Sequence, residues 1–127
     1  MYILDTDFIF SYFDSNQSTH QQASNLEEKF GDSHIIVSNL VKQELATVIS
    51  SRFGSLLAKE ILENLTLFDP QEVFFDEIET EKIWKLFWSF QKKRISFVDC
   101  SNLLLAQKYN CKIASFDQFY PKEMLLV

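Results

Sequence analysis

The segment Tyr2-Ile3-Leu4-Asp5-Thr6-Asp7 opens the chain with a short apolar run that ends at an acidic residue. Such a run is typical of a buried β-strand, and a carboxylate at its end lies at the edge of the sheet that the strand joins. In a parallel α/β sheet, the carboxyl ends of neighbouring strands share this edge, and ligands bind in the crevice beside it. Asp5 therefore marks a candidate site.

Three further acidic residues occupy comparable places along the chain. Glu44 lies in the helical segment after Ile35-Ile36-Val37, Asp99 opens a long apolar segment, and Asp117 follows the last strand-like run but one. If the strands are parallel, these carboxylates meet Asp5 at one edge of the sheet. Carboxylates that lie so close repel one another unless a divalent cation binds between them. The placement therefore predicts a cation site.

The chain as a whole alternates strand-like and helical segments, which is the signature of βαβ units and a mostly parallel sheet. We expect strands at about residues 2–5, 34–37, 66–68, 112–115 and 124–127, with a further extended piece at 73–75. We expect helices at about residues 8–13, 17–30, 39–51, 55–65, 79–91 and 97–109. The pattern predicts an α/β fold.

Length and composition indicate a single domain that spans residues 1–127. Hydrophobic residues make up 46% of the chain and include 13 Phe, which is ample for a buried core. No stretch approaches the roughly 18 apolar residues of a membrane span, and the apolar start lacks the basic flank of a signal peptide, so we expect a cytoplasmic protein. The net charge of -6 argues against a protein that coats nucleic acid with a basic surface.

The cysteines and histidines form no recognisable site. Cys100 and Cys111 are too few for a disulfide framework and match no zinc spacing, so we expect both to be small core residues. His20 lies in a polar segment and His34 at a strand entrance, and we interpret both as structural or surface residues. The carboxylates are therefore the main candidates for a functional site.

The position of Glu44 can be judged from its angle on the predicted helix. At about 100° per residue, Glu44 falls inside the broad arc that the apolar residues of this segment fill, namely Leu40, Val41, Leu45, Val48 and Ile49. A charge on a buried face normally needs a partner or a metal. The alternative is a glutamate at the edge of the arc whose carboxylate reaches water.

The other three acids have an alternative interpretation as helix caps. Ser96-Phe97-Val98-Asp99 fits a capping box, in which the acid accepts a hydrogen bond from the N-cap amide. Asp5 and Asp117 each precede a short helical segment and could cap it. Capping does not prevent metal binding, because the first turn of a helix favours an anion. Asp7 is a fifth candidate, either as an outer member of the site or as a helix-start acid.

Four stretches contain the four acids in order along essentially the whole chain: Ile3-Leu4-Asp5-Thr6-Asp7, Val37-Ser38-Asn39-Leu40-Val41-Lys42-Gln43-Glu44-Leu45, Ile95-Ser96-Phe97-Val98-Asp99 and Ile113-Ala114-Ser115-Phe116-Asp117. Together they resemble the PIN-domain ribonucleases, and in particular the small toxins of VapBC toxin-antitoxin pairs. The resemblance implies a mostly parallel sheet of four to five strands sandwiched by helices.

The same resemblance implies a metal-dependent endoribonuclease that hydrolyses RNA phosphodiester bonds. The implied ligands of Mg²⁺ or Mn²⁺ are Asp5, Glu44, Asp99 and Asp117. Thr6 and Ser115 become hydroxyl neighbours that orient a carboxylate or a metal-bound water, or alternatively a helix-start residue and a cap. The implied partners are RNA, a cognate antitoxin protein and a second copy of the chain in a homodimer.

Two departures from the family pattern affect the loops around the last strand. The glycine often found before this strand is replaced by Asn110-Cys111, and the charged residues that often follow the last aspartate are Gln118-Phe119 here. Neither departure removes a ligand, but both leave the loop shape and the substrate preference open.

A basic run and an aromatic group are further candidates for contact with RNA. Lys92-Lys93-Arg94 could contact the RNA backbone, or it could complement the dipole at a helix end. Trp84, Phe87 and Trp88 could stack on bases, but their helical spacing is more typical of a core or a subunit interface.

Two other functions stay open from the sequence. Asp5-Thr6-Asp7 after a strand imitates the nucleophile and acid pair of haloacid-dehalogenase-like phosphotransferases, although a clear downstream lysine motif and acidic pair are missing. A non-catalytic PIN-like binding module would keep the fold without the chemistry. Binding of Mn²⁺ that depends on Asp5 would argue against such a module.

Overall fold

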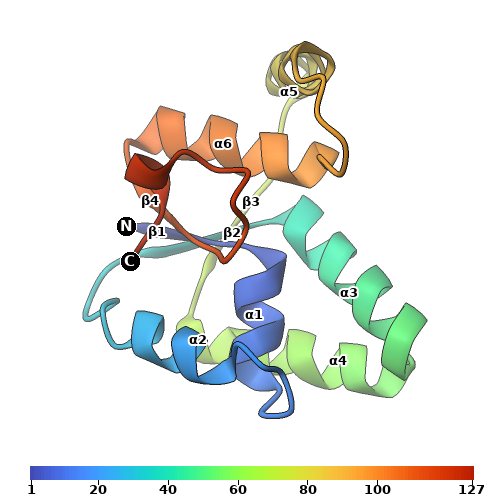
Figure 1. Ribbon diagram of the computed structural model, residues 1–127, viewed down its shortest axis with the longest axis vertical. Helices are drawn as coiled ribbons and strands as arrows, with labels where there is room; N and C mark the ends of the chain where they lie inside the picture. The colour runs from blue at the N-terminus through green and yellow to red at the C-terminus, as the bar shows by residue number, and fades with distance from the viewer.

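The computed structural model describes residues 1–127 and contains a four-stranded sheet in which every pair of strands is parallel (Figure 1). The spatial order is β3-β2-β1-β4, and the strands are β1 (Tyr2–Leu4), β2 (Ile35–Ser38), β3 (Gln71–Val73) and β4 (Lys112–Ala114). β1 lies inside the sheet because it pairs with both β2 and β4. The sheet confirms the predicted fold class.

Six α-helices connect the strands: α1 (Thr6–Phe13), α2 (His20–Glu27), α3 (Asn39–Phe53), α4 (Ser55–Asn64), α5 (Glu77–Ser89) and α6 (Phe97–Tyr109). Helix α6 lies on one side of the sheet with α5 packed against it, and the other helices lie on the opposite side (Figure 1). Short 3₁₀ helices occupy Leu65–Phe68 and Lys122–Met124. None of the helices has the length and apolar character needed to cross a membrane.

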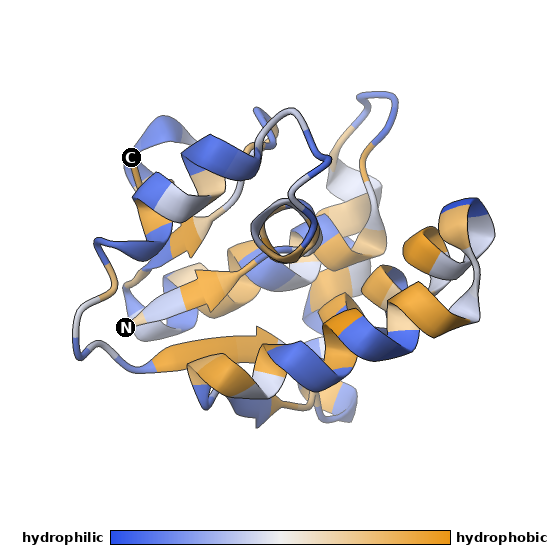
Figure 2. Cartoon of the chain, turned by 90° about the horizontal axis from the view of Figure 1, so that it is seen from below, coloured by the Kyte–Doolittle hydropathy of each residue, from blue (hydrophilic) through white to orange (hydrophobic).

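Two hydrophobic cores lie on the two faces of the sheet, because successive strand residues point to opposite faces. The larger core unites residues of α1, α2, α3 and α4 with the strand residues Leu4, Ile35, Val37 and Ala114. The smaller core unites Leu105 and Ala106 of α6 with the alternate strand residues Ile3, Ile36, Val73 and Ile113. In Figure 2 the strands are coloured mainly as hydrophobic, as expected for a parallel sheet covered on both faces.

The strand expected at residues 66–68 is wrong. These residues continue α4 as the 3₁₀ helix Leu65–Phe68, which ends where Asp69 takes a left-handed conformation with φ at 46°. Leu67 is 79% exposed, so the apolar pattern here did not report burial. The extended piece expected at 73–75 is displaced to β3, which begins directly after Pro70.

The strand expected at residues 124–127 does not form either. The amides of Met124 and Leu125 donate to the carbonyls of Pro121 and Lys122 in a 3₁₀ turn, at 2.9 and 3.2 Å. These local bonds leave the Leu126 amide to reach β4, where it donates to the Ile113 carbonyl at 2.9 Å. The C-terminal segment therefore adds one isolated bridge to the edge of the sheet and no strand.

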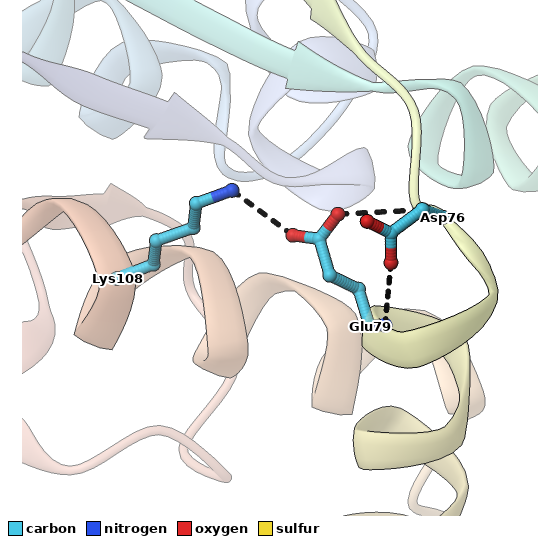
Figure 3. Close-up of polar contacts among 3 residues, drawn as sticks. All are labelled: Asp76, Glu79 and Lys108. Carbon is cyan, nitrogen blue, oxygen red and sulfur yellow. Dashed lines mark hydrogen bonds and ion pairs between the residues drawn. The ribbon is translucent and has the colours of Figure 1, made fainter.

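Helix α5 is fixed at its start by a capping box and to α6 by an ion pair (Figure 3). Asp76 Oδ1 accepts from the Glu79 amide at 2.7 Å, and Glu79 Oε1 accepts from the Asp76 amide at 3.3 Å. The other oxygen of Glu79 pairs with Lys108 Nζ of α6 at 3.0 Å. These bonds satisfy amides that the first turn of a helix otherwise leaves without partners.

Replacement of the cap in Asp76→Ala is expected to lower the free energy of unfolding by about 1 kcal/mol, the usual cost of losing an N-cap side chain. Urea denaturation followed by circular dichroism measures the change. Glu81→Ala, at an exposed position of the same helix, serves as the control and should stay within about 0.5 kcal/mol of the wild type. Equal stability of Asp76→Ala and the wild type would contradict the role assigned to this cap.

Candidate active site

One cavity of about 320 Å³ collects the acidic residues that the sequence singled out. Its wall contains Thr6 and five carboxyl groups, those of Asp5, Asp7, Glu44, Asp99 and Asp117. They come from the segments after β1 and β4 and from helices α3 and α6, which meet at the carboxyl edge of the parallel sheet. The tertiary structure thus brings together side chains that are more than 110 residues apart in the chain.

Asp5 is the most deeply buried of the five carboxyl groups, with 4% of its surface exposed. Its Oδ1 accepts from the Thr6 amide at 2.8 Å and from Asn102 Nδ2 at 3.0 Å. Its Oδ2 accepts from the hydroxyls of Ser115 at 2.8 Å and Tyr120 at 3.1 Å. Four donors occupy the roughly four lone-pair positions of a carboxylate, so the orientation of Asp5 is fully determined.

Asp7 is linked to Asp5 through Ser115. The Ser115 hydroxyl lies 3.2 and 3.3 Å from the two carboxyl oxygens of Asp7, and the Phe116 amide donates to Asp7 Oδ2 at 3.0 Å. Ser115 also accepts from the Asp117 amide at 3.0 Å. Ser115 therefore orients Asp5 and stabilises a turn, whereas the alternative of a helix cap does not apply because no helix follows directly.

Glu44 is half-buried and faces the cavity from α3. The Thr6 hydroxyl donates to its Oε2 at 2.8 Å, which orients the carboxylate. The apolar arc that led to Glu44 is only partly buried, because Val48 lies at the cavity with 36% of its surface exposed and Leu40 is half-buried. Glu44 thus lies where the buried face of α3 opens into the cavity. Its position is intermediate between a charge on the buried face and a glutamate that reaches water from the edge of that face.

Asp99 combines the cap and the cavity position. Its Oδ2 accepts from the Ser96 amide at 3.0 Å, while its own amide donates to the Ser96 hydroxyl at 3.0 Å, which completes the predicted capping box. Asp117 closes a turn by accepting from the Phe119 amide at 2.9 Å. No helix forms directly after Asp117, so the helix cap predicted there is wrong. Both residues nevertheless line the cavity, and at Asp99 capping and participation in the site coexist.

Burial and mutual repulsion change the protonation of the group. Burial, followed by the charge of Asp7, raises the pKa of Asp5 well above its usual range. Burial also raises the pKa of Asp7 to about 6. The pKa values of Glu44 and Asp99 are raised by burial first, with the charge of Asp117 acting in the same direction on both. A bound cation would lower all of these values.

The cavity offers carboxylate oxygens, which are the type of ligand that a hard divalent cation prefers. Glu44, Asp99 and Asp117 each keep one carboxyl oxygen to which no protein group donates, and Mg²⁺ prefers carboxylate oxygens together with water. No group of three acidic, histidine or cysteine side chains is close enough to form a ready-made metal site. The fit therefore rests on oxygen chemistry and a shared cavity.

Two residues that hold Asp5 were missed in the sequence. Asn102 is completely buried on α6, and its Nδ2 donates to both Asp5 and the Tyr120 hydroxyl, the latter at 3.2 Å. Tyr120 is 2% exposed and follows Asp117 by three positions. The available signal was the polar pair Ser101-Asn102 inside an apolar helix, three residues after Asp99. A buried amide of this kind requires partners.

The basic run Lys92-Lys93-Arg94 lies outside the cavity wall. All three side chains are exposed, and they follow the end of α5 at Ser89 in the loop before α6. The helix expected to end at residue 91 ends earlier, so the run is not part of a helix terminus.

The aromatic residues of α5 are less buried than a core requires. Trp84 and Trp88 are stacked at 5.6 Å between ring centroids and are 45% and 70% exposed. Ile83 is the residue of α5 that is fully buried. Both cysteines were expected in the core. Cys100 is buried, whereas Cys111 is only half-buried.

Comparison with known proteins identifies the family to which this fold belongs. The family model of the PIN domain matches residues 2–121. The chain belongs to the PIN domain family. This PIN domain is 26% identical over 110 residues to ribonuclease VapC26 of Mycobacterium tuberculosis, a match that covers 87% of this chain and 81% of that protein.

A solved structure shows the same fold. The PIN domain resembles the crystal structure of VapC20 of Mycobacterium tuberculosis, described as a toxin that cleaves the sarcin-ricin loop, with a TM-score of 0.82. The match covers 94% of this chain and 92% of that chain at 18% identity. These findings confirm the resemblance to PIN-domain proteins that the four sequence stretches indicated.

Loss of the amide in Asn102→Ala is expected to lower the free energy of unfolding of the PIN domain by about 1–3 kcal/mol, because it leaves buried acceptors on Asp5 and Tyr120 without a donor. Urea denaturation measures the change. Gln107→Ala, at an exposed position of the same helix, is the matched control and should change it by less than about 0.5 kcal/mol. If both variants unfold alike, the network does not hold Asp5 in the way described.

The raised pKa values predict a stability that falls as the pH rises. Burial raises the pKa of Asp7 from its ordinary 3.8 to about 6 in the folded protein, so its contribution to stability is complete below about pH 4 and is lost as the pH passes 6. In chelator, the melting temperature should therefore be higher at pH 5 than at pH 7.5. Asp7→Asn should reduce this difference, whereas Asp32→Asn, at an exposed position away from the cavity, should leave it unchanged. A melting temperature independent of pH would refute the assignment.

Proposed function

We propose that this protein is a metal-dependent endoribonuclease that hydrolyses phosphodiester bonds in RNA, and that it acts as the toxin of a type II toxin-antitoxin pair. The observation that carries the proposal is the convergence of five carboxyl groups on one cavity at the carboxyl edge of the sheet. Membership of the PIN domain family and similarity to a protein named as a VapC ribonuclease support the same chemistry.

The proposed metal ligands are Asp5, Glu44, Asp99 and Asp117. Bound among them, Mg²⁺ or Mn²⁺ supplies the charge that polarises the scissile phosphate and lowers the pKa of an attacking water. Glu44, Asp99 and Asp117 each have an oxygen without a protein donor. Asp5 has none, because each of its oxygens accepts two hydrogen bonds. Direct binding of the ion by Asp5 thus requires the release of a donor.

The hydroxyl and amide groups around the acids act by orientation in this proposal. Thr6 holds the carboxylate of Glu44, and Ser115 holds Asp5 and the turn of Asp117. Asp7 lines the cavity, is linked to Asp5 through the Ser115 hydroxyl, and adds negative charge that favours cation binding. Side chains that are fixed before the substrate arrives need little reorganisation during the reaction.

The decisive test is the cleavage of defined RNAs with Mn²⁺ or Mg²⁺ and with chelator. The wild type is expected to cleave only with metal, and Asp5→Asn and Asp99→Asn are expected to lose at least about 100-fold in rate, since each removes a charged ligand. Asp32→Asn, an exposed acid outside the cavity wall, is the control and should cleave as the wild type does. Cleavage that survives chelation, or equal cleavage by all variants, would refute the proposal.

A non-catalytic PIN-like binding module is the second candidate. It is favoured by the absence of a ready-made group of three metal ligands. Titration calorimetry with Mn²⁺ separates the two functions, because the nuclease should bind the ion in a manner that depends on Asp5. Absence of both binding and cleavage would identify the module. Detection of a covalent phosphate on Asp5 would instead favour the third alternative, a haloacid-dehalogenase-like phosphotransferase.

The proposed partners are a cognate antitoxin that covers the acidic cavity and a second copy of the chain. The proposed location is the cytoplasm, where cellular RNA is found. Light scattering of the purified protein is expected to give about twice the 14.9 kDa mass of one chain. A mass equal to that of one chain at micromolar concentration would exclude the homodimer without affecting the nuclease.

A further inference from the structure

A single cation lines the acidic cavity. Of the 14 residues in its wall, Arg52 is the only lysine or arginine, and five of the others are acidic. Arg52 lies in the last turn of α3, eight residues beyond Glu44. At about 1.5 Å per residue, the two positions are roughly 12 Å apart along the helix axis. The cavity therefore has an anionic end and a cationic end.

The Arg52 guanidinium has no ion-pair or hydrogen-bond partner inside the protein. The three ion pairs of the chain join Lys42 to Glu72, Lys59 to Glu63 and Lys108 to Glu79. No side-chain hydrogen bond involves the Arg52 guanidinium, although several carboxylates line the same cavity. Its N–H donors are therefore available to an anion from outside.

Aromatic contacts position the guanidinium without using its donors. The Arg52 Cζ lies 5.3 Å from the ring centroid of Phe53. Phe53 in turn packs against Phe10, with ring centroids 5.8 Å apart, and Phe10 is part of the cavity wall. A cation held over a ring keeps its N–H groups free at the edge of the plane. Arg52 is exposed and lines the cavity, and its planar guanidinium makes no hydrogen bond within the protein.

The shape of the guanidinium indicates which class of anion it binds. A phosphodiester offers two oxygens that match a guanidinium, which binds them in pairs. We propose that Arg52 binds a phosphate of the RNA strand next to the scissile one; the inference rests on the proposed ribonuclease function. The distance from Glu44 places this phosphate beyond the reacting one. Between the two ends, Leu45, Val48 and Ile49 form an apolar wall.

In this proposal Arg52, rather than the basic run Lys92-Lys93-Arg94, binds the phosphate next to the scissile one. Lys92, Lys93 and Arg94 are exposed and do not line the cavity. In a chain of net charge -6, a cation in the cavity wall itself reduces the repulsion of RNA at the place where the strand would lie.

The test measures the binding of fluorescently labelled single-stranded RNA by anisotropy, with Mg²⁺ present, on the Asp99→Asn background. Arg52→Gln is expected to weaken binding about tenfold and to reduce the slope of log K against log salt by about 0.7, the value for one phosphate contact on a single strand. The loss should be equal for two RNAs of different sequence, because a phosphate carries no base information. Arg94→Gln and Lys59→Gln are the matched controls and should bind as the parent does.

Steady-state cleavage by the protein without the background change gives a second readout. Arg52→Gln should raise KM with little change in kcat, and Arg52→Lys should recover part of the affinity as a point charge. Unchanged affinity and salt slope in Arg52→Gln, while the parent binds and cleaves RNA, would overturn the inference and leave the nuclease intact. A wild type that neither binds nor cleaves RNA would overturn both. Retained RNA affinity with loss of binding to a partner protein would also overturn it.

Discussion

The structure depends on the buried carboxylate of Asp5 and the four groups that donate to it. The Thr6 amide comes from the start of α1, Asn102 from α6, Ser115 from the end of β4 and Tyr120 from the C-terminal segment. These bonds span up to 115 residues of sequence. One buried carboxyl group after β1 thus links α1 and α6, which lie on opposite faces of the sheet, to the chain segments that follow β4. Removal of any donor leaves a buried acceptor unsatisfied, which costs more than the bond itself contributes.

The same carboxylate is the centre of an unfavourable charge group. Asp7, Glu44 and Asp99 have raised pKa values because they share a partly buried cavity with like charges. Functional sites often carry such strain, and the rest of the fold provides the stability to tolerate it. This repulsion among the carboxylates also favours the binding of a cation, because a positive charge between them relieves it. Arg52, at the other end of α3, offers the opposite charge to the substrate.

One error in the predicted fold has a clear cause. The strand at residues 66–68 was predicted from an apolar pattern that normally reports burial, yet Leu67 is 79% exposed. Trp84 and Trp88 are also largely exposed, which excludes a core position and leaves the subunit interface and base stacking open. Local hydrophobicity cannot distinguish a residue facing the core from one facing outward on an outer helix such as α5. Conversely, the caps predicted at Asp5 and Asp99 were correct and incomplete, since both residues also belong to the cavity.

The order of residues alone determined the alternation of strands and helices, the placement of four acids at or near the apolar segments and the resemblance to PIN-domain proteins. These properties are local or recur at a helical or strand period, so a single chain reveals them. Only the tertiary structure decided that Asn102 and Tyr120 would hold Asp5, and that Arg52 rather than Lys92-Lys93-Arg94 would line the cavity. Such contacts join residues far apart in the chain, and their geometry depends on how helices pack across a sheet, which no local pattern encodes.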